Sequence, residues 1–442
     1  MLKNTRDPEL ALWQSAVDEV VAKKSSGAST QDISSGSKIV ARPDTTQDLV
    51  AAAALDVEGA EKGNQTPMPP PTKSSAEDIG SVAAYCSTLV RKSVTDLVKL
   101  NPKAASIDRQ QLTAKMGDCD PRWVEPALKY AEFLLKCQPV PYRVYHDLSD
   151  FVLPMNDTCR IAIIGDWGTG QDAAKTVLAQ MARKKPDIAI HLGDIYYSCT
   201  DFEATNYFYN IWKKTLGDTR SFTLAGNHDM FSGGGPYYDL LDKLGQPASY
   251  FCLRNDNFQI IALDTGLNDR QPGGTQPTYL QDTEVAWLED KIKTAGKRRT
   301  ILLSHHQLFS AWEAIAGQSV NPKLQAQVQD LLPNISVWLW GHEHNQVIYG
   351  RWAGVLARCI GHGGFPIGAT ELGPNVKYAN VPIVANTALG VDADGVFMRH
   401  GYAIIELTSQ DATIAYYDDQ DEDTPIYQEK LENQQAAGSP QV

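Results

Sequence analysis

The sequence predicts an α/β protein, and three observations support this fold class. Six short apolar runs follow one another between residues 161 and 340, and their lengths are typical of strands. The runs are apolar at consecutive positions, as expected of strands that are buried on both faces. The segments between the runs are long enough to form crossover helices. Together these features indicate strands and helices that alternate within one domain.

The expected strands can be placed in order along the chain. The apolar runs cover residues 161–164, 188–192, 222–224, 258–263, 301–303 and 337–340. Two further strands, at 402–407 and 413–417, are expected to close the fold. We therefore assign residues 154–417 to the α/β domain.

The segments outside this domain differ in composition. Residues 1–76 predict a short amphipathic helix at 10–24, followed by a disordered linker rich in Ser, Gly, Thr and Pro. Residues 77–153 show helical periodicity and predict a helical domain or cap. Residues 418–442 form an acidic, Gln-rich tail that we expect to be disordered.

Composition narrows the possible functions. The formal net charge of -13 opposes the coating of nucleic acid, which requires a basic patch. No stretch is apolar enough to predict a membrane span, and the first residues do not resemble a signal peptide. The 7 cysteines are scattered and odd in number, which favours free thiols over a disulfide framework. We therefore expect a cytoplasmic protein with a small substrate.

Polar residues that can bind metal ions follow five of the six strands. The motifs are Gly165-Asp166-Trp167-Gly168, Gly193-Asp194-Ile195-Tyr196-Tyr197, Gly226-Asn227-His228-Asp229, Ser304-His305-His306 and Gly341-His342-Glu343-His344. Because ligands of open α/β sheets bind at the carboxyl ends of the strands, we expect these motifs to converge on one site. Two neighbouring cations repel each other and require an anionic bridge, for which Asp194 is the candidate.

The ordered motifs resemble those of the calcineurin-like metallophosphoesterases, and specifically the purple acid phosphatase branch. The motifs at Asp166 and Asn227 are most similar to the small tartrate-resistant type. The resemblance covers residues 159–417 and implies the αββα sandwich of that family, here preceded by an N-terminal helical region. It also implies an enzyme that hydrolyses phosphoric ester bonds.

The resemblance further implies a metal ion pair and its ligands. Iron(III) would be bound by Asp166, Tyr197 and His344, with Asp194 as the bridge. A divalent iron, zinc or manganese ion would be bound by Asn227, His305 and His342. The choice of His305 over His306 stays open from the sequence. Tyr197 is the distinguishing ligand, because a phenolate favours a trivalent ion and Gly168 stands where many relatives carry a histidine.

A metal-bound hydroxide would then attack the phosphorus atom, and both ions would neutralise the phosphoryl oxygens. Asp194 and Asn227 serve this reaction as ligands, and His228 is expected to bind the phosphate or protonate the leaving oxygen. We expect Asp229 or another carboxylate to orient the His228 imidazole. The expected substrate is a small phosphate monoester or a phosphoprotein, as for an acid phosphatase.

Two alternatives remain open at this point. The first is a phosphodiesterase or nucleotide pyrophosphatase, because dinuclear sites of this type serve both reactions. The second is a docking or delivery protein that binds a partner through the N-terminal helical region. The triplet Asp264-Thr265-Gly266 also matches a motif of aspartic proteases, but it has no second copy and is expected to be a turn after a strand.

Overall fold

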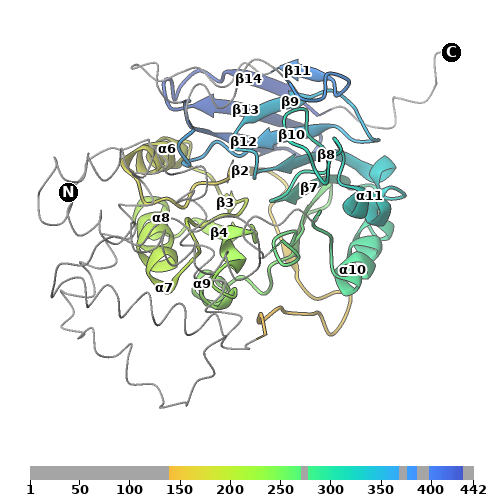
Figure 1. Cartoon of the computed structure of the whole chain (residues 1–442), viewed down its shortest axis with the longest axis horizontal. Coiled ribbons are helices and arrows are strands. Elements are labelled where there is room, and N and C mark those ends of the chain that lie inside the picture. The colour runs from red at the N-terminus through yellow and green to blue at the C-terminus, as the bar shows by residue number, and fades with distance from the viewer. Residues whose placement is uncertain (1–138, 270–276, 368–375, 386–397, 432–442) are drawn as a thin grey trace, which may run out of the picture. The chain divides into compact units, whose positions relative to one another are not determined.

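The computed structural model describes residues 139–269, 277–367, 376–385 and 398–431 (Figure 1). The linker, most of the helical region and the end of the acidic tail that the sequence predicts lie outside these residues. The predicted binding of a partner by the N-terminal helical region also involves residues outside these ranges, so it stays a prediction. Within the described residues, no helix is both long enough and apolar enough to cross a membrane.

Two mixed β-sheets form the centre of the domain (Figure 1). The first has the strand order β14-β13-β12-β2-β3-β4, and the second has the order β1-β5-β6-β7-β8-β10-β9-β11. In the first sheet the strands are β2 (Cys159–Ile164), β3 (Ile188–His191), β4 (Arg220–Thr223), β12 (Gly401–Leu407), β13 (Ala412–Asp418) and β14 (Tyr427–Lys430). In the second they are β1 (Val152–Pro154), β5 (Phe251–Arg254), β6 (Phe258–Ala262), β7 (Arg299–Ser304), β8 (Ile335–Trp340), β9 (Gln346–Tyr349), β10 (Ala357–Ile360) and β11 (Ile383–Ala385).

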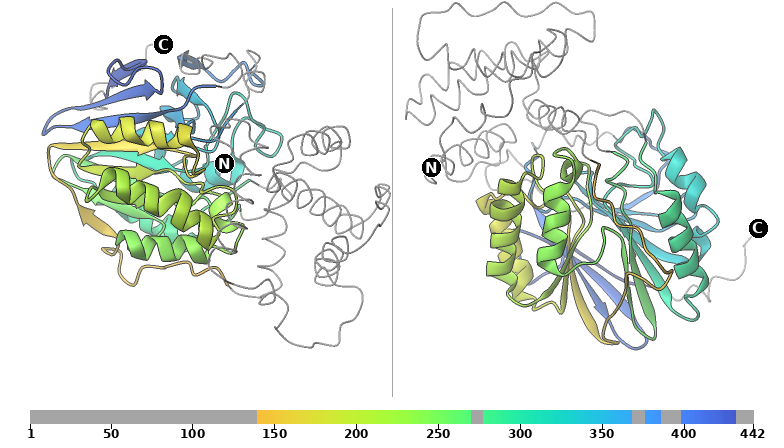
Figure 2. Two further views of the ribbon diagram at one scale, coloured as in Figure 1. Left: turned by 90° about the vertical axis from the view of Figure 1, so that its left-hand side faces the viewer. Right: turned by 90° about the horizontal axis from the view of Figure 1, so that it is seen from below.

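Helices cover the outer face of each sheet, so the layers run helix, sheet, sheet, helix (Figure 2). One helical layer contains α6 (Asp172–Arg183), α7 (Asp201–Glu203), α8 (Asn210–Leu216) and α9 (Gly235–Leu244), with the π-helical turn η2 (Ala204–Tyr209) between α7 and α8. The other contains α10 (Asp282–Lys293) and α11 (Pro322–Val328). Short 3-10 turns occur at η3 (His228–Met230) and η4 (Leu332–Asn334). This arrangement confirms the predicted fold class.

Three apolar clusters hold these layers together. One lies between the two sheets and contains Ile161, Ile190 and Ile301, all fully buried. The others lie between each sheet and its helices, with Trp212 in one cluster and Trp287 in the other. Strands buried on both faces explain why the runs in the sequence are apolar at consecutive positions.

All eight predicted strands are present, and the parallel pairs matter most for the site. β2 pairs with β3 and β3 with β4 in parallel register, as do β6 with β7 and β7 with β8. The sequence did not reveal β1, β5, β9, β10, β11 or β14, which are short strands of three or four residues. The prediction of a disordered tail is wrong for 427–430, because β14 pairs with β13.

Residues 139–154 pack against the α/β domain as an extended segment. β1 pairs with β5, the Trp287 indole N–H donates to the Asp150 carbonyl (3.0 Å), and the Tyr142 hydroxyl donates to Glu284 Oε2 (3.0 Å). The helical domain predicted for 77–153 stays a prediction for residues 77–138, which lie outside the described residues. Residues 152 and 153, at its end, belong to strand β1.

Candidate metal centre

The five motifs meet at one edge of the two sheets. Asp166 follows β2, Asp194 follows β3 and Asn227 follows β4, whereas His305 follows β7 and His342 follows β8. Hydrogen bonds between the loops hold them together. The Asp166 N–H donates to the Gly193 carbonyl (3.1 Å), and the Gly341 N–H donates to the His305 carbonyl (3.0 Å). The predicted convergence of the strand ends is therefore present in the fold.

A first group of ligand atoms is rich in oxygen. One atom each from Asp166, Asp194 and His344 lies within 4.8 Å of the others. The Tyr196 hydroxyl oxygen is 2.9 Å from Asp166 Oδ1, 3.2 Å from Asp194 Oδ2 and 2.8 Å from His344 Nε2. Four side chains from three loops thus converge, and we call them the carboxylate group.

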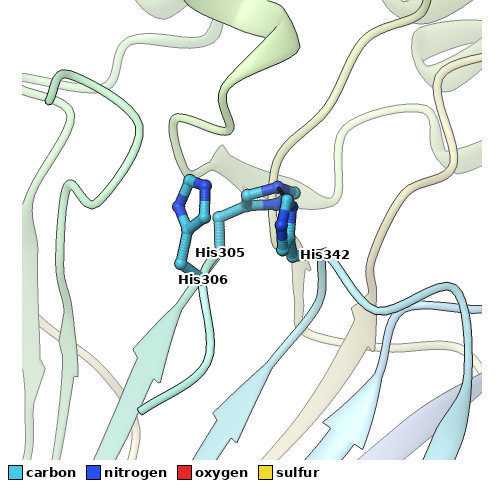
Figure 3. A group of neighbouring side chains, drawn as sticks. All are labelled: His305, His306 and His342. Atoms are coloured by element: carbon cyan, nitrogen blue, oxygen red, sulfur yellow. Dashed lines mark hydrogen bonds between the residues drawn. The ribbon is translucent and has the colours of Figure 1, made fainter. Parts of the chain in front are cut away.

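A second group is rich in imidazole and is shown in part in Figure 3, where the rings of His305 and His342 lie close together, edge to face, and His306 stands beside them. His305 Nε2 lies 3.2 Å from His342 Nδ1 and 3.2 Å from Asn227 Oδ1. The other ring nitrogen of His305 lies 3.0 Å from the Leu192 carbonyl. This contact leaves Nε2 as the nitrogen that can bind an ion. We call His305, His342 and Asn227 the imidazole group.

Asp194 lies between the two groups. Its Oδ2 atom is 3.2 Å from the Tyr196 hydroxyl and 3.3 Å from His305 Nε2. Its Oδ1 atom accepts the His228 N–H (3.0 Å). The carboxylate therefore contacts donors of both groups, which is the position that a bridging ligand requires.

The ionisation of these side chains fits a site built for cations. Burial alone would raise the pKa of Asp194, but the imidazoles of His305 and His228 hold it well below its usual range. Burial acts to lower the pKa of His305, yet the Asp194 carboxylate outweighs it and raises that pKa to about 9. Burial and the carboxylates of Asp166 and Asp194 raise the pKa of Tyr196 well above its usual value. Protons on His305 and Tyr196 therefore offset the negative charge of the carboxylates, and bound metal cations would offset the same charge.

The donor set matches the ions that the sequence implies. Carboxylate, phenol and amide oxygens are hard donors, and imidazole nitrogens bind zinc, iron and similar ions. The carboxylate group supplies mainly oxygen, whereas the imidazole group supplies two ring nitrogens and one amide oxygen. The residues present therefore fit two adjacent metal ions.

The structure places Tyr196 and Tyr197 differently. The Tyr196 hydroxyl lies within hydrogen-bond distance of the other three side chains of the carboxylate group. Tyr197 is also buried; its ring lies 6.0 Å from that of Phe365, and its carbonyl oxygen is 2.6 Å from His228 Nδ1. The motif spacing predicts Tyr197 as the ligand, and this assignment stays a prediction.

The contacts also separate His305 from His306. His306 Nε2 lies 3.0 Å from Asp269 Oδ2, and His306 Nδ1 lies 3.0 Å from Thr265 Oγ1. Both ring nitrogens of His306 thus have neighbours outside the ligand groups, whereas His305 Nε2 lies among the ligands. Burial and the neighbouring His305 lower the pKa of His306 well below its usual value. This geometry favours His305 as the ligand.

His228 stands at the edge of the carboxylate group. Its ring lies 4.8 Å from the Tyr196 ring and 4.7 Å from the Phe231 ring. Its Nδ1 atom is 2.6 Å from the Tyr197 carbonyl oxygen, which therefore orients the imidazole.

Asp229 fixes the backbone of two ligand loops. One carboxylate oxygen accepts the N–H groups of Asp194 (3.0 Å) and Gly226 (2.8 Å), and the other accepts the Ile195 N–H (3.0 Å). Burial and the nearby Asp194 raise the pKa of Asp229 to about 7. Asp229 is thus a residue that ties the Asp194 loop to the Asn227 loop.

The ligand loops adopt backbone conformations that are rare for residues with side chains. Asp166, Asp194 and His342 have φ of 55°, 71° and 64°. Such strain is concentrated at functional sites, where the surrounding structure holds it in place. Gly226 shows a related constraint, because a Cβ atom there would collide with Asp194 Oδ1.

Comparison with known proteins agrees with this geometry. Residues 159–346 match the family model of the calcineurin-like phosphoesterases. The 3',5'-cyclic adenosine monophosphate phosphodiesterase CpdA of Pseudomonas aeruginosa is 25% identical over 211 residues, which are 45% of this chain and 71% of that protein. A 3',5'-cyclic-nucleotide phosphodiesterase of Nostoc sp. is 26% identical over 128 residues, which are 28% of this chain and 45% of that protein.

Among solved structures, the purple acid phosphatase PPD1 from seeds of yellow lupin (Lupinus luteus) gives a TM-score of 0.43 with 14% sequence identity. The matched region covers 62% of this chain and 54% of that structure. The matched family region, 159–346, contains every predicted metal ligand. Residues 159–346 are thus similar to the calcineurin-like phosphoesterases, and the protein is a hydrolase that acts on phosphoester bonds.

Proposed function

We propose that the protein hydrolyses phosphate monoesters at a dinuclear centre that pairs iron(III) with a divalent iron, zinc or manganese ion. The observation that supports this most is the Tyr196 hydroxyl, which lies within 3.2 Å of two carboxylates and one imidazole. A phenolate among carboxylates is a hard, anionic donor set, which favours a trivalent ion. The motif resemblance to purple acid phosphatases points to the same pairing.

In this proposal each ligand has a defined place. Asp166, Tyr196 and His344 hold the iron(III), the imidazole group holds the divalent ion, and Asp194 binds both. Tyr197 is the alternative to Tyr196 that the motif spacing favours. When bound, the two cations activate a water molecule and neutralise charge on the phosphoryl oxygens.

His228 would act on the substrate rather than on the metals. Its backbone N–H donates to Asp194 Oδ1, and the Tyr197 carbonyl accepts a hydrogen bond from Nδ1 when that nitrogen is protonated. In this proposal Nε2 is the ring nitrogen that faces a substrate oxygen. From there His228 can hold the phosphoryl group or donate a proton to the leaving oxygen.

The proposal is tested by metal analysis of the purified full chain, together with a visible spectrum and an assay of phosphate esters. We expect either two iron ions per chain or iron together with zinc or manganese in equal amounts. We also expect a broad tyrosinate-to-iron band, and faster turnover of p-nitrophenyl phosphate than of its bis ester. A colourless protein that contains two zinc or two manganese ions would contradict the iron pairing. Predominant cleavage of the bis ester would contradict the monoester preference.

The second candidate is a phosphodiesterase, which the two curated relatives favour because both are named as cyclic-nucleotide phosphodiesterases. The same ligand groups can serve diester cleavage, since a diester also offers two unesterified oxygens to the metals. Turnover of 3',5'-cyclic AMP at a rate at least equal to that of p-nitrophenyl phosphate would establish this candidate over the first.

A further inference from the structure

The triplet Asp264-Thr265-Gly266, which the sequence left as a turn, begins a rigid loop of residues 264–269 beside the imidazole group. The Asp264 N–H donates to Glu284 Oε1 (2.8 Å), and Asp264 Oδ1 accepts the Leu267 N–H (2.9 Å). A Cβ atom on Gly266 would collide with the backbone of Ala225 and Gly226. The loop is therefore anchored to the buried Glu284 and packed against the loop that carries Asn227.

This loop holds the His306 ring at both nitrogens. Thr265 Oγ1 accepts the His306 backbone N–H (3.0 Å) and lies 3.0 Å from Nδ1. Asp269 Oδ2 lies 3.0 Å from Nε2. An ionised Asp269 carboxylate can only accept a hydrogen bond, so Nε2 keeps its proton and donates a hydrogen bond to Asp269. Nδ1 is then the acceptor for the Thr265 hydroxyl proton, which selects one neutral tautomer of His306.

The fixed ring of His306 packs directly on the ligand imidazoles. Its centroid is 4.4 Å from that of His342, with an interplanar angle of 43°, and 4.8 Å from that of His305, with an angle of 85° (Figure 3). His306 follows His305 immediately after β7. Any rotation of the His306 ring would therefore disturb both imidazoles of the group.

We propose that Asp269 and Thr265 are positioning residues, which hold His306 so that its ring orients His305 and His342 toward the divalent ion. The inference rests on the proposed dinuclear function, and it adds a set of residues that no motif of the family resemblance contained. Outer groups that orient metal-binding imidazoles typically change metal affinity by about 10-fold to 100-fold when they are removed.

The test is the Zn²⁺ affinity of the full chain, measured by competition with a chromophoric chelator and without any turnover assay. Asp269→Ala and Thr265→Val should each weaken Zn²⁺ binding by about 10-fold or more. Asp269→Asn should restore binding to near the wild-type value, because its amide oxygen still accepts the Nε2 proton. Asp239→Ala, at an exposed aspartate on α9, is the matched control and should have no effect.

A double-mutant cycle identifies the route of the effect. If Asp269 acts through His306, then Asp269→Ala should cause no further loss in a His306→Phe background, where the ring remains but both nitrogens are gone. A full additional loss in that background, or Asp269→Asn as weak as Asp269→Ala, would show instead that the charge of Asp269 acts directly, and would overturn the proposal.

The two proposals fail in distinguishable ways. Wild-type protein that takes up no Zn²⁺ would overturn the dinuclear site and this inference with it. Normal uptake by the wild type, with unchanged affinity in Asp269→Ala and Thr265→Val, would overturn only the positioning role. Thermal unfolding of each metal-free variant shows whether the fold is intact, and Thr265→Val, which is nearly isosteric, keeps the test valid if Asp269→Ala does not fold.

Discussion

The carboxylate group and the imidazole group lie side by side, but their donors differ in charge and hardness. The carboxylate group offers two carboxylates, a phenol and one imidazole, whereas the imidazole group offers two ring nitrogens and the amide oxygen of Asn227. Hard anionic donors favour an ion of higher charge, and neutral donors suit a divalent ion. One strand edge thus presents two unequal positions, which Asp194 connects. The following predictions test that inequality.

The largest effect is expected for Asp194→Ala, because this residue contacts both groups. Loss of the bridge should release both ions and lower kcat/KM by about 10⁴-fold, which corresponds to several kcal/mol of transition-state stabilisation. Metal content by mass spectrometry and turnover of p-nitrophenyl phosphate measure the two consequences. Retention of both ions with high activity would show that the groups are bridged by something other than Asp194.

The next effect concerns the carboxylate group alone. Tyr196→Phe should lower iron content, abolish the visible band and reduce turnover by about 10³-fold, since one of the two cations is lost. Tyr197→Phe is the matched control and should keep iron and colour. The reverse result, in which Tyr197→Phe loses the colour, would assign the phenolate to Tyr197 and would break the proposed donor set.

A smaller effect is expected for His228→Asn, which leaves both ligand groups intact. Turnover should fall by about 10²-fold because a group that holds or protonates the substrate is lost, while metal content stays unchanged. The loss should be smaller for p-nitrophenyl phosphate than for alkyl phosphates, because p-nitrophenolate leaves without a proton. An equal loss for both substrates would argue that His228 binds the phosphoryl group rather than protonating the leaving oxygen.

The smallest effect is expected at Glu284, a buried carboxyl group that, unlike Asp194, has no imidazole among the groups that shift its pKa. Burial and the nearby Asp264 raise the pKa of Glu284 well above its usual value. Protonated Glu284 contributes its full stability below the pKa of the unfolded state, which is about 4.3. As pH rises from there through the raised pKa of the folded state, this stability is lost, by at most about 1.4 kcal/mol per pH unit.

Glu284→Gln should therefore flatten the decline of the unfolding free energy above pH 5, as measured by urea unfolding across pH 5–8. Asp239→Asn at the surface should leave the slope as it is in the wild type. A slope that is equally steep in Glu284→Gln would show that Glu284 is not the titrating group.

Prediction from the sequence succeeded where long apolar runs and glycine-flanked motifs carried the information. The strands that lead to Asp166, Asp194, Asn227, His305 and His342 are all present, since strands buried on both faces leave a continuous apolar run. Short strands such as β9 and β14 were missed, because three or four residues are too few to show the alternation that distinguishes a strand from a loop. The contacts of Asp229 with the backbone N–H groups of Asp194 and Ile195 were not predicted, because they join loops that are distant in sequence.

The sequence by itself determined the order of the metal-binding motifs and the fold class, because both are properties of local pattern. Only the tertiary structure decided which side chains meet: it brings the Tyr196 hydroxyl to Asp166 and His305 Nε2 to Asn227. Adjacent residues share one sequence context, but they point in different directions when the backbone turns after a strand. The His306 ring, for example, is held by Thr265 and Asp269, which are distant in sequence and close in space.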